Sequence, residues 1–199
     1  MRISGGRACG IPLRAPRGAD IRPAMDRLRQ GVFSSLGARV EGARFIDFFA
    51  GTGSYGLEAL SRGAAGGVFV ENNRAAVAAL SENITAVCRS AGCAESLVRI
   101  QKMDALAWTP APEDRADLVF ADPPFAETPA IGEVLLRRFG ACVRDPSSAI
   151  VVFEMPGEME IACAGWQCVK RIGRGRGQPT CCLYAQEAGV SSTGGRAWL

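Results

Sequence analysis

Apolar residues recur along the chain in two rhythms, which together predict the order of its helices and strands. Short apolar runs predict strands, and apolar residues spaced three or four apart predict helices. The predicted strands are Phe45–Phe49, Val68–Glu71, Leu97–Ile100, Leu118–Ala121 and Ala149–Glu154. The predicted helices between them lie near Tyr55–Arg62, Arg74–Ser90 and Pro129–Phe139. Strands that alternate with helices indicate an α/β fold, with a mostly parallel sheet covered on both faces.

The chain after Glu154 has a different pattern, because its helical spacing stops there. Trp166–Ile172 and Pro179–Gln186 read as two successive strands around the basic, glycine-rich turn Gly173–Gly177. Two strands joined by such a short turn are antiparallel. We therefore expect a seven-stranded sheet with an antiparallel edge.

The residues before the first strand predict a basic extension over residues 1–40. Met1–Pro16 alternates apolar residues with glycine, arginine and proline, as in a short hairpin or arm. Pro23 then suits the first turn of an amphipathic helix that ends at Gly37. With 199 residues, the chain fits one α/β domain over residues 1–188, followed by a loose tail over 189–199.

Composition narrows the class of protein. Hydrophobic residues make up 48% of the chain and charged residues 22%, as in ordinary globular proteins. No apolar run is long enough to span a bilayer, and the first residues lack the apolar core of a signal peptide, so we expect a cytoplasmic protein. The 8 cysteines contain no C-x-x-C pair. We therefore expect buried free thiols and no metal site.

The chain contains 0 histidines, which excludes imidazole as a general base or metal ligand. Its net charge is only +3, but the basic residues are concentrated near the two ends. Such segregation favours a polyanionic partner, although a run of charge is by default only a solvated face. The candidate residues for contacts with such a partner are Arg7, Arg22, Arg27, Arg29, Arg174 and Arg176.

A glycine-rich turn follows the first predicted strand. Gly51, Gly53 and Gly56 allow a tight turn and let a ligand approach the backbone at the carboxyl edge of the sheet. Glu71 closes the next strand, where a carboxylate can accept hydrogen bonds from both hydroxyls of a ribose. Together these features indicate a cofactor that contains a nucleoside, but the glycine pattern alone suits a dinucleotide equally well.

Two further acids bear on the cofactor. Asp47 precedes the glycine turn, where it would repel a pyrophosphate but suits a cofactor that carries an amino acid and a sulfonium. It could instead be a surface acid that caps the following helix. Asp104 follows the third strand and could bond an adenine amino group, or simply cap the residues after it.

The most specific signal is Asp122-Pro123-Pro124-Phe125, directly after the fourth strand. Two prolines cannot continue a strand, so they indicate a stiff loop at the sheet edge. Asp122 and the Pro123 carbonyl could each accept one hydrogen of an exocyclic amino group, making its nitrogen a better nucleophile. Phe125 could stack on the base. This pattern predicts methyl transfer to a base amino group, aided by proximity and alignment.

These residues resemble a known family. The glycine turn with Asp122-Pro123-Pro124-Phe125 is similar to class I methyltransferases that act on nucleobase amino groups. Further matches narrow the resemblance to the RsmD-type bacterial 16S rRNA guanine-N2 methyltransferases, over nearly the whole chain to about Glu187. They are Met1-Arg2-Ile3, Gly6-Arg7, Arg22-Pro23, Asp26-Arg27-x-Arg29, Gly56-Leu57-Glu58-Ala59-Leu60-Ser61-Arg62-Gly63-Ala64 and Leu183-Tyr184.

The resemblance implies a Rossmann-like methyltransferase fold, S-adenosylmethionine as donor, and a guanine of 16S rRNA as acceptor, within the assembling or assembled small ribosomal subunit. We also expect the protein to be a monomer and to have no membrane partner. The implied cofactor-binding residues are Asp47, Ala50, Gly51, Gly53, Gly56, Glu71, Asn72, Asp104 and Ala105. The sequence departs from the family at Gln30, Asn72 and Ile11-Pro12, none of which belongs to Asp122-Pro123-Pro124-Phe125.

Three alternatives remain open from sequence. A DNA adenine-N6 methyltransferase uses the same acidic proline loop, although no separate DNA-reading domain is visible. A nicotinamide-dependent oxidoreductase could use the same glycine turn. A non-catalytic RNA-binding module could retain the same fold.

Overall fold

A computed structural model describes residues 1–15, 23–173, 175 and 177–187 of the chain. Its elements follow one another as α1 (Pro23–Leu36), η1 (Gly37–Val40), β1 (Arg44–Phe48), α2 (Ser54–Ser61), β2 (Gly66–Val70), α3 (Arg74–Ala91), η2 (Glu95–Leu97), β3 (Val98–Gln101), η3 (Pro112–Asp114), β4 (Leu118–Ala121), α4 (Thr128–Phe139), β5 (Ile150–Pro156), β6 (Trp166–Ile172) and β7 (Pro179–Gln186).

The seven strands form one sheet in the order β3-β2-β1-β4-β5-β7-β6. The pairs from β3 to β5 are parallel, while β7 runs antiparallel to both β5 and β6. This confirms the predicted α/β class, the mostly parallel sheet and its antiparallel edge. The reversal in strand order between β1 and β4 is the position where such sheets bind ligands, at their carboxyl edge.

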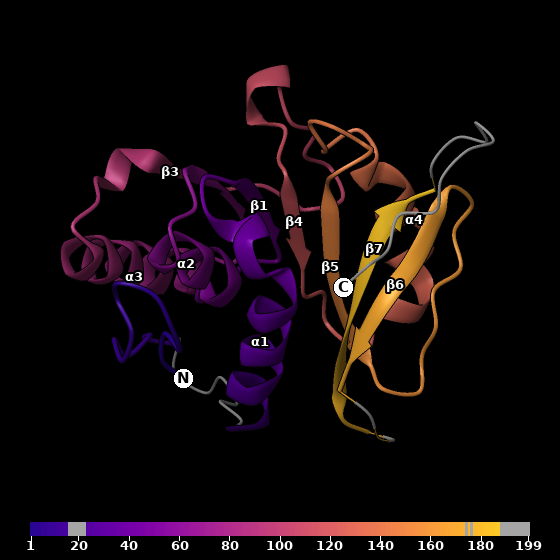
Figure 1. The fold of residues 1–199 in the computed structure, drawn as a ribbon, viewed down its shortest axis with the longest axis horizontal. Helices are drawn as coiled ribbons and strands as arrows, with labels where there is room; N and C mark the ends of the chain where they lie inside the picture. The colour runs from indigo at the N-terminus through magenta and orange to yellow at the C-terminus, as the bar shows by residue number, and fades with distance from the viewer. Residues whose placement is uncertain (16–22, 174, 176, 188–199) are drawn as a thin grey trace.

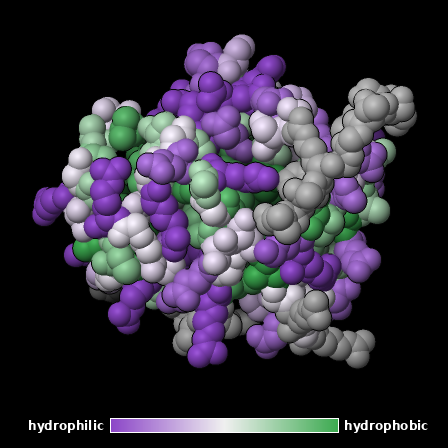
Figure 2. Space-filling view, in the orientation of Figure 1, coloured by the Kyte–Doolittle hydropathy of each residue, from purple (hydrophilic) through white to green (hydrophobic). Residues whose placement is uncertain are grey.

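The sheet separates two apolar cores. In Figure 1, α1, α2 and α3 lie in front of the sheet and α4 lies behind it. Phe45, Phe69 and Phe120 pack into the front core, and Phe48 and Phe153 into the back core. This alternation is what a sheet covered on both faces requires, because successive side chains point to opposite sides. Hydrophilic and apolar residues intermingle on the outer surface of the front face (Figure 2).

The first residues form the predicted hairpin. Ile3 donates its amide to the Ile11 carbonyl at 2.9 Å, and Leu13 donates to Met1 at 3.1 Å. Ile3 and Leu13 are buried in the front core, so the hairpin is anchored by apolar side chains as well as by its ladder. The predicted tail over 189–199 lies outside the described residues.

Most predicted element boundaries agree with the structure to within one or two residues, and three differences have causes that the structure shows. β1 ends before Phe49, whose φ of 56° leaves the strand region. Leu97 closes the 3-10 turn η2 and does not open β3. β2 starts earlier than predicted, because Gly66 pairs with Arg44 although glycine is a poor strand residue.

Candidate active site

The glycine turn between β1 and α2 is a strained backbone segment at the carboxyl edge of the sheet. Phe49 has a φ of 56°, and Gly53, directly before α2, has a φ of 79°. A left-handed conformation at a phenylalanine costs on the order of 1 kcal/mol, and such residues cluster at ligand sites. Gly56 serves packing instead, since an added Cβ would lie 2.4 Å from the Phe69 ring.

Asp47 joins β1 to the helix that leaves this turn. Its Oδ2 accepts the Gly56 amide at 2.9 Å, and its side chain is buried. Burial raises the pKa of Asp47 to about 8; the Gly56 hydrogen bond opposes this rise, and nearby Glu71 adds to it. Asp47 therefore does cap α2, as the alternative interpretation held, but from a buried position and not from the surface. A buried carboxyl of this kind gains stability from a nearby cation.

Glu71, the residue after β2, ties the glycine turn to the next strand. Its Oε2 accepts the Gly51 amide and its Oε1 accepts the Asn73 amide, both at 2.8 Å. Each carboxylate oxygen has two lone pairs, so each can accept a further bond from a ligand hydroxyl.

A cavity of about 220 Å³ opens beside Glu71. It is lined by Phe49, Val70, Glu71, Asn72, Met103, Asp104, Ala105, Leu106, Pro124 and Glu127. The fold thus brings together four predicted cofactor residues and one proline of the acidic loop. Asp104 also has the capping role of the alternative interpretation, since its Oδ1 accepts the Leu106 amide at 2.6 Å.

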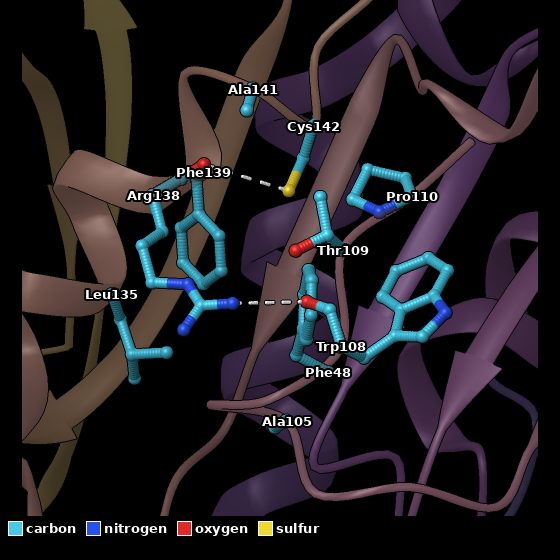
Figure 3. A pocket seen from close by; sticks show the side chains of 10 residues that line it. All are labelled: Phe48, Ala105, Trp108, Thr109, Pro110, Leu135, Arg138, Phe139, Ala141 and Cys142. Carbon is cyan, nitrogen blue, oxygen red and sulfur yellow. Dashed lines mark hydrogen bonds between the residues drawn. The ribbon is translucent and has the colours of Figure 1, made fainter. Parts of the chain in front are cut away.

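A second cavity, of about 340 Å³, lies on the α4 side of the sheet (Figure 3). Ala105 lines it as well as the first cavity. From α4, Arg138 donates to the Leu106 carbonyl and, at 3.1 Å, to the Trp108 carbonyl. The Phe48 ring lies 5.6 Å from the Trp108 ring. These contacts support the wall that the second cavity shares with the first.

The acidic loop starts where β4 ends. Asp122 donates its amide to the Phe48 carbonyl at 3.5 Å, which places the loop beside β1. Thr128 donates its amide and its hydroxyl to the Pro124 carbonyl, at 3.1 and 3.0 Å, and these bonds lead the chain into α4. Pro123 is buried, and Phe125 is 37% exposed. The loop is therefore anchored at both ends, with an aromatic side chain at its surface.

Asp122 lies between two other acids on neighbouring strands. Ala121 pairs with Phe48, the last residue of β1, and with Phe153 of β5, so Asp122 lies just beyond the end of β1 and beside Glu154 of β5. Burial raises the pKa of Asp122 well above its ordinary value, and the charges of Glu154 and Asp47 raise it further. A carboxyl held in such surroundings is a strong hydrogen-bond acceptor once it is ionised.

Glu154 is a site residue that the sequence pattern did not single out. Its Oε2 accepts the Tyr55 hydroxyl at 2.6 Å, and the Tyr55 ring stacks on Phe120 at 5.5 Å. Burial raises the pKa of Glu154, while the hydrogen bonds from Tyr55 and Cys181 lower it. Glu154 is the acidic last residue of an otherwise apolar predicted strand, as Glu71 is, and this pattern is the signal that could have identified it.

The structure corrects one predicted RNA contact. Arg29 is only 1% exposed. It donates to the Asp26 carboxylate at 2.8 Å and to the Arg2 carbonyl at 2.5 Å, and it lies 3.5 Å from buried Glu58. Arg29 therefore joins the hairpin, α1 and α2 inside the protein and does not reach a polyanion.

The structure describes only two of the other predicted arginines. Arg7 and Arg27 are exposed. Arg22, Arg174 and Arg176 lie outside the described residues.

All 8 cysteines are free thiols. Within the described ranges, no cluster of histidine, cysteine, aspartate or glutamate could hold a metal ion. The helices of the described part include none that is long and apolar enough to cross a bilayer.

Comparison with known proteins assigns the chain to a family. Residues 1–185 match the model of the family described as conserved hypothetical protein 95. The chain is 32% identical to the ribosomal RNA small subunit methyltransferase D of Escherichia coli strain K12, over 94% of this chain and 91% of that protein.

Solved structures share the fold. The Escherichia coli protein yhhF superposes with a TM-score of 0.77 at 30% identity, over 95% of this chain and 99% of that one. The ribosomal protein L11 methylase of Lactobacillus delbrueckii has a TM-score of 0.64 at 15% identity, over 88% of this chain and 86% of that one. The second likeness concerns the fold alone.

Proposed function

Because the chain belongs to the conserved hypothetical protein 95 family, that of the small subunit methyltransferases D, we propose that it methylates a guanine of 16S rRNA at N2, with S-adenosylmethionine as donor. One observation carries the proposal. Asp122, followed by two prolines and an exposed phenylalanine, lies at the edge of the sheet next to Asp47 and the glycine turn.

The residues around the first cavity suit this donor. Glu71 would accept bonds from the ribose hydroxyls, Asp104 would bond the adenine amino group, and Asn72 and Ala105 would flank the adenine. Ala50, Gly51 and Gly53 shape the turn beside them, and Gly56 lets α2 pack closely on the sheet. Asp47 is buried and has a raised pKa, so a cationic ligand group nearby would stabilise its charged form. When bound, S-adenosylmethionine supplies an electrophilic methyl group.

The acidic loop would prepare the acceptor. The guanine N2 lone pair is delocalised into the ring, so the free amino group is a poor nucleophile. The Asp122 carboxylate accepts one hydrogen of this group and the Pro123 carbonyl accepts the other, which turns the lone pair out of conjugation. Phe125 stacks on the base and Pro124 stiffens the loop, and alignment of this kind supplies much of the acceleration.

The substrate would be 16S rRNA within the assembling or assembled small ribosomal subunit, bound by a monomer. The exposed Arg7 and Arg27 are the described candidates for phosphate contacts. Arg22, Arg174 and Arg176 stay predictions from the sequence.

Calorimetric titration tests the cofactor. We expect S-adenosylmethionine to bind and NADH not to bind. The reverse result would support an oxidoreductase and contradict the proposal. Methyl transfer into double-stranded DNA, without transfer to ribosomal RNA, would support a DNA adenine methyltransferase.

A further inference from the structure

Asn83 of α3 links two segments that are far apart in the sequence. It is buried, with 1% of its surface exposed. Its Nδ2 donates to the Thr52 carbonyl and to the Arg14 carbonyl, both at 2.9 Å, and its Oδ1 accepts the Arg14 amide at 2.8 Å. Both amide hydrogens and one carbonyl lone pair are thus used.

The two linked segments have different expected ligands. Thr52 lies in the glycine turn, between Gly51 and Gly53, where the cofactor would approach the backbone. Arg14 belongs to the N-terminal arm, defined here as residues 1–15. The arm precedes α1 in the sequence and carries Arg7, a candidate for RNA contact.

The arm also contacts α2, the helix that follows the turn. Ser61 of α2 accepts the Arg7 amide at its carbonyl, at 2.7 Å, and the Ala8 amide at its hydroxyl, at 2.9 Å. Buried Glu58 of α2 accepts the Ser4 amide at 2.7 Å. The docked arm therefore holds both the helix after the turn and, through Asn83, the turn itself.

We infer that Asn83 is a positioning residue that couples docking of the arm to the shape of the cofactor turn, so that RNA and cofactor strengthen each other's binding. The inference rests on the proposed function for the identity of the two ligands. Undocking of the arm would break two of the three hydrogen bonds of the Asn83 side chain, both of them to Arg14. Losing hydrogen bonds at a buried amide is costly. A ligand that stabilises the docked arm thereby also stabilises the turn, and the effect is reciprocal.

The test measures this coupling as the ratio of two Kd values for S-adenosylhomocysteine, one without small ribosomal subunits and one with them. The Kd of S-adenosylhomocysteine is determined by calorimetry for the full chain, alone and with small ribosomal subunits that lack the methyl mark. We expect the subunits to lower the Kd about five-fold or more in the wild type. In Asn83→Asp the ratio should approach one, because an aspartate oxygen would face the Thr52 and Arg14 carbonyls and could donate to neither. A purely structural role would change stability and leave the ratio intact.

Glu82→Gln is the matched control, since it breaks only the exposed Arg14–Glu82 ion pair of 2.5 Å beside Asn83. It should retain the wild-type ratio. Amide exchange of the wild type gives a second measurement that needs no variant: S-adenosylhomocysteine alone should slow exchange in peptides from residues 1–15. A ratio of one in the wild type, an unchanged ratio in Asn83→Asp, or unaltered exchange in the arm would overturn the inference. Failure to bind S-adenosylhomocysteine at all would instead contradict the proposed function.

Discussion

The Tyr55 hydroxyl donates to Glu154 at 2.6 Å beneath the acidic loop, and this bond holds a buried carboxylate next to Asp122. Tyr55→Phe removes the donor but keeps the ring that stacks on Phe120. Since the bond lowers the pKa of Glu154, its loss should raise that pKa and destabilise the protein by about 1–3 kcal/mol near neutral pH. Urea unfolding measures the change. Unaltered stability would mean that the bond contributes little.

Asp47 gives a prediction for the pH dependence of stability. Its pKa is about 8 in the folded protein, against an ordinary 3.8. The unfolded chain therefore loses this proton first, and the contribution of Asp47 to stability falls as pH rises from about 4 to about 8. Asp47→Asn retains an acceptor for the Gly56 amide and cannot ionise. The variant should gain stability relative to the wild type across this range, by on the order of 5 kcal/mol at pH 8.

The comparison uses denaturant unfolding of the cofactor-free protein at several pH values. At pH 4 the two proteins should be nearly equal in stability. A difference that does not grow with pH would show that burial does not raise the pKa of Asp47.

Ionisation of Asp47 should favour cofactor binding, although it lowers the stability of the cofactor-free protein. A cationic ligand group favours the charged carboxylate, so binding near pH 7 should release a proton from Asp47. The binding heat of S-adenosylmethionine should then vary with the ionisation enthalpy of the buffer, and Asp47→Asn should weaken both this variation and the affinity. Identical buffer dependence in the two proteins would argue against this role.

Substitution of the exposed arginines should affect RNA binding, whereas substitution of the buried Arg29 should affect stability. Arg7→Ala and Arg27→Ala should each weaken RNA binding and reduce the slope of log affinity against log salt by about 1, because each removes a phosphate contact. Arg29→Met should instead lower stability by about 1–3 kcal/mol, since it removes the buried hydrogen bonds of Arg29 to Asp26 and to the Arg2 carbonyl.

Filter binding at several salt concentrations and thermal unfolding distinguish these effects. If Arg29→Met weakened RNA binding and kept wild-type stability, the buried role of Arg29 would be contradicted.

The elements and the glycine turn could be predicted from the sequence because their signals are local. The apolar run Leu118–Ala121 and the two prolines that end it need no distant information, and β4 has the predicted bounds. Strand ends at β1 and β2 could not be located as well, because Phe49 adopts a strained φ and Gly66 is held in its strand by tertiary pairing.

The errors in the site concern residues whose partners are distant in the sequence. A charge count treats every arginine as solvated, so it cannot identify the burial of Arg29 against Glu58. The roles of Glu154 and Asn83 depend on Tyr55 and Arg14, which are 99 and 69 positions away. Such pairs are apparent only once the chain is folded.

The most direct test of the central claim is nucleoside mass spectrometry of 16S rRNA after unmethylated small subunits react with S-adenosylmethionine and this protein. The wild type should add one N2-methylguanosine per subunit. Asp122→Ala should lower the rate by about 100-fold or more, with cofactor affinity retained, because it removes the acceptor for one hydrogen of the guanine amino group. No N2-methylguanosine from the wild type, or an undiminished rate in Asp122→Ala, would contradict the account.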